Sequence, residues 1–451
     1  MRIHLIAIGG SAMHNLALAL HHNGHHVSGS DDEIYNPARD RLQKYGLLPK
    51  QNGWNPSIID QSIDAVIVGM HARIDNPELK KAQELGIPIH SYPSFLAQHA
   101  RNKTRVVIAG SHGKTSTTSI IMHVLHKSNT DFDYLVGAQI DGFETMVRLS
   151  DAPLMVIEGD EYLSSPLDRR PKILHYEPHI AILTGIAWDH MNVFPTFQNY
   201  CSQFQAFLAS MPSKSTLYYY EGDEHIPKIL PALDSSSKSV PYSAFTHEQR
   251  GEETIIRLGD QAVSIPLFGK HNLENLQAAY LVLKQLGISN EVFLEHIPSF
   301  TGAAKRLQKL GAGKGSEVYL DFAHAPSKAK ATSTAFKAKH TSKPITAVLE
   351  LHTYSSLNQA FLPEYRGSLD AADRGVVFYN PHTIAMKRLE PLNKEQVKAA
   401  FQREDLLVFD DPEALQKWLE QEDWSEYHWL FMSSGTFGGL DLKAWVPKKL
   451  A

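Results

Sequence analysis

The sequence predicts an α/β protein of three domains, each built around a parallel β-sheet. The first observation is length, because the chain has 451 residues and a globular domain typically takes about 100 to 200. The second is a recurrence of short apolar runs of strand length along the chain. The third is that several of these runs end in a glycine turn that leads into a helical pattern, as in alternating β and α elements. We place the domains at residues 1–102, 103–300 and 301–451.

Composition limits the classes of function. The formal net charge of −5 gives no broad basic field, so we expect no nucleic-acid partner. Cys201 is the single cysteine, which excludes an internal disulfide framework and fits the reducing cytoplasm. No apolar stretch reaches the roughly 18 residues of a membrane span. An apolar run follows Met1, but Gly9 and Gly10 interrupt it, so we predict a strand and a turn there.

The first domain has the layout of a nucleotide-binding unit. Ile3 to Ile8 is a predicted strand, Met13 to His22 a helix, and His25 to Ser28 the next strand, followed by Ser30 and Asp31. The turn Gly9-Gly10-Ser11 lies between the first strand and the helix, where a pyrophosphate can bind, and Asp31 would approach a ribose or base. The strict G-x-G-x-x-G pattern is absent, so a plain βαβ unit without a ligand is the alternative.

A polar loop follows the third strand of this domain. Ala65 to Gly69 is the predicted strand, and His71 and Asn76 lie in the loop before the next helix. Ligands bind at the C-terminal ends of parallel strands, so both residues are candidates for the same site. The alternative is a loop with only a structural role.

The central domain begins with the strongest motif in the chain. The strand Val106 to Ala109 runs into Gly110-Ser111-His112-Gly113-Lys114-Thr115-Ser116 and a helix. Backbone N–H groups at such a turn can cradle phosphates, Lys114 would bind the β- and γ-phosphates, and the Thr115 hydroxyl would bind Mg²⁺. Two residues separate the glycines here instead of the usual four, so a glycine-rich turn without a ligand is the alternative.

Acidic residues and a histidine follow the next two strands of this domain. Glu158-Gly159-Asp160-Glu161 comes after the strand Leu154 to Ile157, and Asp189-His190 comes shortly after Ile180 to Thr184. Carboxylates beside a phosphate loop suit Mg²⁺, although a surface acidic turn is the alternative. A single histidine is usually structural, but His190 shares this sheet edge with Glu158, which favours a role as a ligand.

Two asparagines begin a later helix. Asn272 and Asn275 follow Gly269-Lys270-His271 and are three residues apart, so they lie on one face of the helix start. Side-chain amides there can bind the edge of an adenine, or they can cap the helix.

Together these motifs resemble the Mur ligase family, the ATP-dependent amide-forming enzymes of peptidoglycan synthesis. The resemblance rests on four segments in order: 110–117, 158–161, 189–191 and 269–275. It covers nearly the whole chain. It implies a Rossmann-like N-terminal domain for a UDP-sugar, a central P-loop ATPase domain, and a Rossmann-like C-terminal domain for the incoming amine. ATP, Mg²⁺ and small-molecule substrates are the implied ligands.

The resemblance also assigns residues in the third domain. Arg306 occupies the family's hinge, where an arginine contacts ATP, and Asp321 approaches the nucleotide. Ala325 replaces a second histidine often found after His324. We expect His324, His352 and Arg366 at the peptide pocket. Strands are predicted at 318–321, 346–350, 375–379 and 429–432, and a helix at 411–420.

Within the family, two segments favour one branch. They are residues 158–176 and the glycine loop 435–439. The favoured branch joins UDP-N-acetylmuramate to the tripeptide L-Ala-γ-D-Glu-meso-diaminopimelate during peptidoglycan recycling. The alternative within the family is addition of L-alanine to the same sugar in de novo synthesis. Outside it, the alternatives are a P-loop ATPase or kinase and a nucleotide sensor.

The implied reaction passes through an acyl phosphate, because a carboxylate is a poor acyl donor until its oxygen carries a phosphoryl group. Phosphoryl transfer needs mainly positioning and charge neutralisation, so no protein nucleophile is expected. The resemblance gives catalytic roles to Lys114, Glu158 and His190, and metal binding to Thr115, Glu158 and His190.

Overall fold

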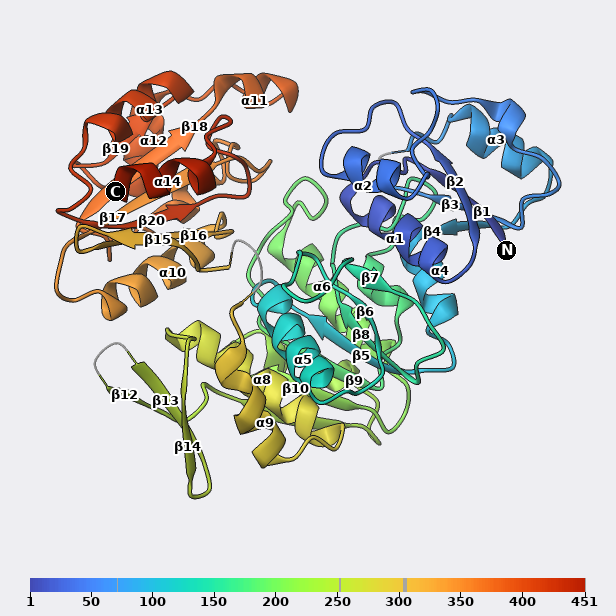
Figure 1. Ribbon diagram of the computed structural model, residues 1–451, viewed down its shortest axis with the longest axis horizontal. Coiled ribbons are helices and arrows are strands. Elements are labelled where there is room, and N and C mark those ends of the chain that lie inside the picture. The colour runs from blue at the N-terminus through green and yellow to red at the C-terminus, as the bar shows by residue number, and fades with distance from the viewer. Residues whose placement is uncertain (71, 251–252, 303–305, 451) are drawn as a thin grey trace. The chain divides into compact units, whose positions relative to one another are not determined.

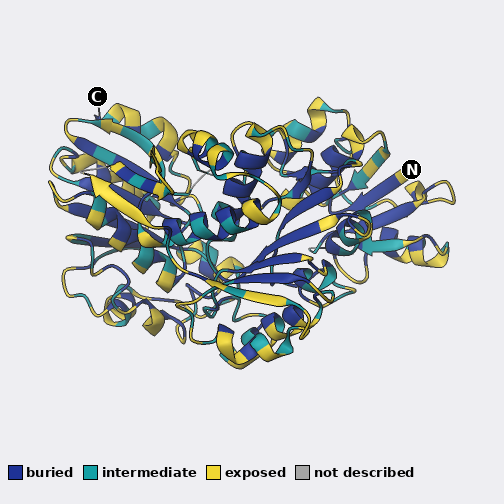
Figure 2. Ribbon diagram, turned by 90° about the horizontal axis from the view of Figure 1, so that it is seen from below, coloured by how far each residue is buried: buried dark blue, intermediate teal, exposed yellow. Residues whose placement is uncertain are grey.

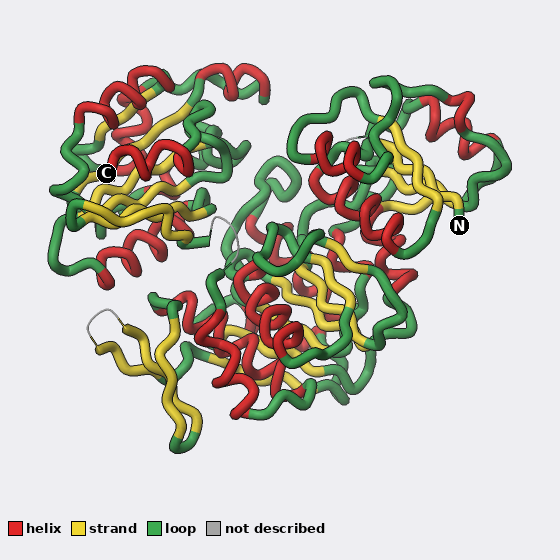
Figure 3. Tube along the Cα trace, in the orientation of Figure 1, coloured by secondary structure: helices red, strands yellow, loops and turns green. Residues whose placement is uncertain are grey.

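Three mostly parallel sheets with flanking helices and one small antiparallel sheet make up the described part of the chain, seen here in a computed structural model (Figures 1 and 3). The structure describes residues 1–70, 72–250, 253–302 and 306–450. The chain divides into two compact units. Unit 1 comprises Met1–Ile186, Cys201–Ser243 and Ala278–Ile297, and unit 2 comprises Ala187–Tyr200, Ala244–Gln277 and Pro298–Ala451. The predicted α/β class with parallel sheets is confirmed, and the three domain boundaries stay predictions.

The first sheet of unit 1 has the strand order β2-β1-β3-β4, with all neighbours parallel. Ile6 pairs with Ser30 on one side and with Val68 on the other, so three strands end at one edge and their loops meet there. The four residues of β3 are all buried, as expected for a parallel strand covered on both faces. The elements are β1 (Arg2–Ile6), α1 (Ser11–His22), β2 (His26–Ser30), α2 (Ala38–Lys44), β3 (Ala65–Val68), α3 (Pro77–Glu84), β4 (Ile89–Ser91) and α4 (Tyr92–His99).

The second sheet of unit 1 has the order β11-β10-β9-β5-β8-β6-β7, parallel except for the β6–β7 pair. Central β5 pairs Ile108 with Glu158 of β8 and Ala109 with Leu183 of β9. The loops that follow β5, β8 and β9 therefore start side by side. The strands are β5 (Thr104–Ala109), β6 (Asp133–Leu135), β7 (Val147–Arg148), β8 (Leu154–Glu158), β9 (Ile180–Leu183), β10 (Thr216–Tyr220) and β11 (Lys238–Tyr242).

Helices flank this sheet, and two of them pass from one unit to the other along the chain. They are α5 (Lys114–Lys127), α6 (Phe197–Ala209), α7 (Ile226–Ile229), α8 (Lys270–Gln285) and α9 (Asn290–His296). The two helices that begin in unit 2 and end in unit 1 are α6 and α8. Figure 2 shows most strands of the parallel sheets in the colour of buried residues.

Unit 2 contains the other two sheets. The small antiparallel sheet has β12 (His247–Arg250), β13 (Glu253–Leu258) and β14 (Gln261–Ile265). The larger sheet has the order β15-β16-β20-β17-β18-β19 and is parallel apart from the β15–β16 pair. Its strands are β15 (Gln308–Gly313), β16 (Ser316–Asp321), β17 (Ile345–Leu351), β18 (Arg374–Tyr379), β19 (Leu407–Phe409) and β20 (His428–Met432), which confirms the four strands predicted here.

Apolar clusters cover both faces of the larger sheet. One cluster joins the sheet to Phe336 of α10 and Phe401 of α12, and the other joins it to Leu419 of α13 and Val446 of α14. Met432 of β20 pairs with both Asp321 and Leu349, so the loops after β16, β17 and β20 share one edge. The helices are α10 (Pro326–Lys339), α11 (Pro381–Met386), α12 (Lys394–Phe401), α13 (Pro412–Gln421) and α14 (Leu442–Leu450).

Short 3₁₀ helices complete the described elements, at Pro56–Ile58, Lys172–His175, Leu230–Ala232, Ile297–Ser299 and Leu362–Tyr365. No helix among the described residues is both long enough and apolar enough to cross a lipid bilayer.

A buried ion cluster connects α4 to the second sheet. Asp133, the first residue of β6, is fully buried, accepts a hydrogen bond from His99 at 2.8 Å, and lies 3.1 Å from the Lys103 ammonium. Burial alone raises the pKa of Asp133, but hydrogen bonds from His99, Ser150 and Lys103 outweigh it and hold this pKa below its usual 3.8. The carboxylate therefore stabilises the folded chain at neutral pH.

Asp133→Asn is expected to lower the free energy of unfolding by about 3 kcal/mol at neutral pH, because Lys103 loses its buried partner. A carboxylate with a depressed pKa stabilises above its unfolded pKa and stops doing so as the pH falls through the folded value. The difference from the parent, measured by urea unfolding, should thus be constant at neutral pH and shrink below about pH 4. Asp131→Asn, which breaks an exposed pair with Arg148, is the control and should change little. A difference in unfolding free energy that does not change with pH would contradict a depressed pKa for Asp133.

Candidate active site

The predicted phosphate loop follows β5 and leads into α5. Gly110 has φ +117°, and a Cβ there would lie 2.3 Å from Thr184 Oγ1 and 2.8 Å from Thr184 N, so only glycine fits. Gly113 is the N-cap of α5 and has φ +75°. Because this N-cap has no side chain to accept from the first-turn amides, those N–H groups can bind an anion.

Lys114 is the first residue of α5, and its ammonium is held inside the loop. Nζ donates to the Gly110 carbonyl oxygen at 2.6 Å and to Glu161 Oε2 at 2.8 Å. Burial alone would lower the pKa of Lys114, but the carboxylates of Glu161, Asp160 and Glu158 together outweigh it, so this pKa lies above its usual value. Lys114 is therefore a cation at neutral pH, as its predicted contact with phosphates requires.

Two of the predicted metal ligands lie next to each other. Thr115 Oγ1 donates to Glu158 Oε1 at 2.7 Å, and the Gly137 N–H donates to Glu158 Oε2 at 2.6 Å. A hydroxyl and a carboxylate at a phosphate loop fit Mg²⁺, which usually takes one or two protein oxygens and completes its shell with water and phosphate. The other residues predicted for this loop, Ser111, His112 and Ser116, lie in the same turn and helix start.

The loop between β6 and β7 contacts two parts of unit 1. At its start, Gly137 donates to Glu158. Near its end, the Glu144 carbonyl accepts from Arg41 at 2.7 Å, and the Met146 N–H donates to Asn15 at 3.0 Å. The same loop therefore holds the carboxylate of Glu158 and the helices α1 and α2.

The third predicted metal ligand, His190, belongs to unit 2. His190 has φ +55°, a conformation that is uncommon outside glycine and often found at functional sites. Its N–H donates to Asp189 Oδ1 at 2.8 Å, and the Lys328 ammonium lies 3.7 Å from Asp189 Oδ2. Burial raises the pKa of Asp189, but Lys328, His190 and His324 outweigh it, so the net shift is downward.

His324 lies in the loop between β16 and α10 of unit 2. Burial, assisted by the nearby Lys328 cation, lowers the pKa of His324 to about 3, so the ring is neutral at physiological pH. Its Nδ1 lies 2.9 Å from the Phe322 carbonyl oxygen, which can only accept, so Nδ1 carries the proton. The Arg306 guanidinium lies 4.8 Å from the centre of the Phe322 ring.

The remaining nucleotide candidates in unit 2 have mixed roles. The Asn272 side-chain amide donates to the Phe268 carbonyl at 2.9 Å, so it stabilises the start of α8. Asn275 is buried in the same helix. Asp321, the last residue of β16, accepts from the Thr332 hydroxyl at 2.8 Å and influences the ring of His271 electrostatically.

Of the peptide-site candidates other than His324, His352 follows β17 and Arg366 is exposed after the last 3₁₀ helix. The hydroxyl of Tyr365, the residue before Arg366, donates to the His324 carbonyl. The sequence did not single out Glu350. This buried carboxylate accepts from Ser433 Oγ and from Phe437 N, the latter at 2.8 Å, and it shapes the glycine loop after β20.

A cavity of about 390 Å³ lies at the C-terminal edge of the first sheet. Four of the residues predicted for a UDP-sugar line it, and the Gly9 N–H donates to Asp31 Oδ2 at 2.7 Å. These four are Gly9, Gly10, Ser11 and Asp31. The cavity is also lined by His14, Glu33, Tyr35, Asn36 and Met70. Three of these residues, Glu33, Tyr35 and Asn36, closely follow Asp31 at the end of a strand, and this position is the sequence signal that could have identified them.

The other three candidates for this site do not line the cavity or are not described. Ser30 ends β2, and its carbonyl accepts from Ala7 and Ile8 at 2.9 and 3.1 Å. The Asn76 side chain caps α3 by accepting from Glu78 and Leu79 at 3.0 and 3.1 Å. His71 lies outside the described residues.

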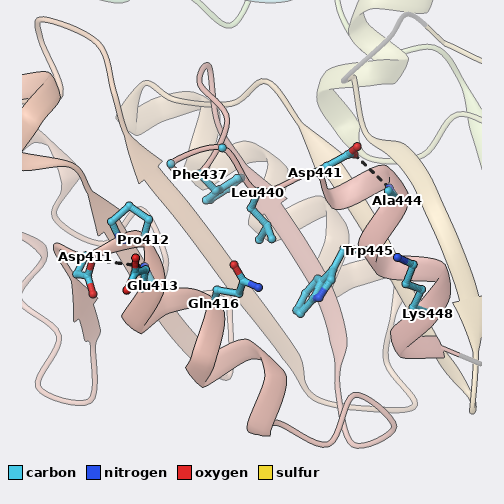
Figure 4. Close-up of a pocket in the computed structure, with 12 residues that line it drawn as sticks. Asp411, Pro412, Glu413, Gln416, Phe437, Leu440, Asp441, Ala444, Trp445 and Lys448 are labelled. Atoms are coloured by element: carbon cyan, nitrogen blue, oxygen red, sulfur yellow. Dashed lines mark hydrogen bonds between the residues drawn. The ribbon is translucent and has the colours of Figure 1, made fainter.

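A larger hollow, of about 560 Å³, lies between α13, α14 and the glycine loop after β20 (Figure 4). Two of its carboxylates hold helix starts: Asp411 accepts from Ala414 at 3.0 Å and Asp441 from Ala444 at 3.1 Å. Among the described residues, none of the individually predicted site residues lines this hollow, but Phe437, Gly438 and Gly439 of the predicted glycine loop 435–439 do.

Two family models match the chain. The description "Mur ligase family, catalytic domain" matches residues 2–104, and "Mur ligase middle domain" matches residues 108–283. UDP-N-acetylmuramate–L-alanine ligase of Caldanaerobacter subterraneus subsp. tengcongensis is 30% identical over 441 residues, covering 93% of this chain and 92% of that protein. UDP-N-acetylmuramate–L-alanyl-γ-D-glutamyl-meso-2,6-diaminoheptandioate ligase of Escherichia coli K12 is 29% identical over 454 residues, covering 98% and 97%. The crystal structure of a murein peptide ligase from Psychrobacter arcticus shares the fold, with a TM-score of 0.69, 22% identity, and coverage of 100% and 99%.

Gly110→Ala is expected to weaken binding of Mg-ADP at least about tenfold, because the added Cβ collides with Thr184 and displaces the loop amides. Isothermal titration calorimetry measures this directly. Gly86→Ala is the matched control: Gly86 has φ +66° and open space around its Cβ position. It should cost about 1 kcal/mol of stability without changing ADP affinity. Equal ADP affinity in Gly110→Ala and the parent would remove this loop from the nucleotide site.

Proposed function

The chain belongs to the Mur ligase family of ATP-dependent, ADP-forming amide ligases, and from this premise we propose that it joins UDP-N-acetylmuramate to the tripeptide L-Ala-γ-D-Glu-meso-diaminopimelate. The observation that carries the proposal is the cluster of Lys114, Thr115 and Glu158 at the start of α5. It combines a cation, helix-start amides and metal-binding oxygens, which are the parts that phosphoryl transfer needs.

The residues of unit 1 take the following roles in the proposed reaction. Lys114 and the amides of the phosphate loop bind the β- and γ-phosphates of ATP. Thr115 and Glu158 hold Mg²⁺, which neutralises phosphate charge when it is bound. Gly9, Gly10, Ser11 and Asp31 bind the UDP-sugar in the 390 Å³ cavity. The reaction takes place in the cytoplasm.

The residues of unit 2 serve the nucleotide and the amine. His190 holds a second metal, and Asn272, Asn275, Arg306 and Asp321 contact the nucleotide. His324, His352 and Arg366 bind the peptide; neutral His324 can accept a proton or hydrogen bond at Nε2. Phosphorylation of the sugar-borne carboxylate gives an acyl phosphate, which the peptide amine attacks, releasing phosphate and forming the amide.

Relatives named for the tripeptide support this acceptor, because they match the chain almost from end to end. The alternative is L-alanine, for which other relatives of similar identity are named. The peptide and alanine differ in size and charge, so a single assay separates the two.

With ATP and UDP-N-acetylmuramate present, the tripeptide is expected to support phosphate release with a kcat/KM at least about 100-fold above that of L-alanine. A site built to hydrogen-bond a charged peptide leaves those groups unpaired when alanine binds. A coupled phosphate assay measures both, and a reaction without the UDP-sugar is the control. A preference for alanine would assign the alternative, and release that needs no amine would indicate an ATPase or kinase.

Glu158→Gln is expected to raise the Mg²⁺ concentration for half-maximal activity at least about tenfold, because the metal loses an anionic ligand. Titrating Mg²⁺ at saturating ATP measures the change. Asp160→Asn is the control, since the Asp160 carboxylate pairs with Lys172 at 2.5 Å instead of with Thr115. An unchanged Mg²⁺ requirement in Glu158→Gln would exclude Glu158 as a ligand.

A further inference from the structure

Glu161 is a buried carboxylate at the end of the acidic segment 158–161, and the proposed reaction gives it no role of its own. Its side chain is 1% exposed, and Oε2 lies 2.8 Å from Lys114 Nζ. The same ammonium donates to the Gly110 carbonyl at 2.6 Å. Two of the three ammonium hydrogens are therefore directed into the protein.

The chain after β8 is built to place Glu161 under the phosphate loop. The Gly159 N–H donates to the Ile108 carbonyl at 2.8 Å, and a Cβ on Gly159 would lie 2.9 Å from Ile173. This close packing of the residues after β8 against the neighbouring strand β5 directs the chain toward Lys114. The neighbouring Asp160 forms its ion pair with Lys172 and influences Lys114 only electrostatically, whereas Glu161 contacts Lys114 directly.

We propose that Glu161 is a positioning residue for Lys114: together with the Gly110 carbonyl it fixes the ammonium so that its third hydrogen faces the bound phosphates. This inference rests on the proposed function only in requiring that the chain binds a nucleotide. The side chain of Lys114 is 15% exposed, which leaves part of it accessible to a ligand.

Glu161 stays paired with Lys114 when the nucleotide binds. Glu161 and Lys114 form a buried ion pair, and separating the two charges of such a pair is strongly unfavourable. An incoming phosphate therefore adds to the pair instead of replacing Glu161. The alternative is competition, in which the Glu161 carboxylate occupies the place of the phosphate and must leave before the nucleotide binds. Competition predicts that removing the Glu161 charge strengthens nucleotide binding, whereas positioning predicts that it weakens binding.

The test is the affinity for Mg-ADP, measured by calorimetry without sugar or peptide, in a double-mutant cycle. Glu161→Gln should weaken binding about tenfold, because the neutral amide no longer holds the ammonium in place. Lys114→Met should weaken binding at least as much. In the Lys114→Met background, Glu161→Gln should cause no further weakening, since Glu161 acts through Lys114 and the substitution removes a carboxylate that has lost this partner.

Asp160→Asn is the matched control and should leave the affinity unchanged. If Glu161→Gln does not fold, Glu161→Asp keeps the charge but withdraws the carboxylate by one methylene, and it should weaken binding by a smaller factor. Tighter binding in Glu161→Gln would establish competition and overturn the proposal. The same loss in both backgrounds, or none in either, would also overturn it. If the parent chain itself does not bind Mg-ADP, the proposed function fails along with the inference.

Discussion

The candidate phosphate site depends on one steric constraint, the close approach of three loops at the C-terminal edge of the second sheet. Strands β8, β5 and β9 end in register, so the segments after them must pass within contact distance. Gly110 and Gly159 lie where a Cβ would meet Thr184 and Ile173. The Thr184 hydroxyl lies within hydrogen-bond distance of the carbonyls of Ala109 and His112, and its single hydrogen ties the turn to β9. The amides at the start of α5 are held in place before any ligand arrives, which is the preorganisation that charge stabilisation requires.

Charge in this region is balanced inside the protein. Lys114 is paired with Glu161, and the Glu158 carboxylate accepts from a hydroxyl and an amide. Unit 2 repeats the principle, with the buried Asp189 carboxylate beside the Lys328 ammonium. Buried ions are tolerated because each has a partner, and a triphosphate with its metal can join such a set without leaving an isolated charge.

Much of the fold followed from the sequence, because apolar runs of strand length and glycine turns depend on local chemistry. The proximity of the Gly-Lys-Thr segment to Glu158 could be predicted for a related reason, since the strand ends of a parallel sheet meet at one edge. Asn76 and Ser30 show the limit: cap residues and strand-end carbonyls have the same polar pattern as ligands, and only the structure shows their hydrogen bonds. Glu161 and Glu350 could not be singled out, because their partners, Lys114 and Phe437, are 47 and 87 residues away.

The loop between β6 and β7 is fixed at both ends, by Glu158 at Gly137 and by α1 and α2 at Glu144 and Met146. Because hydrogen bonds hold both ends of this loop, the number of residues between them matters more than which residues they are. Over evolutionary time, its exposed positions can drift freely, whereas an insertion or deletion would shift a carboxylate at one end or a helix pair at the other.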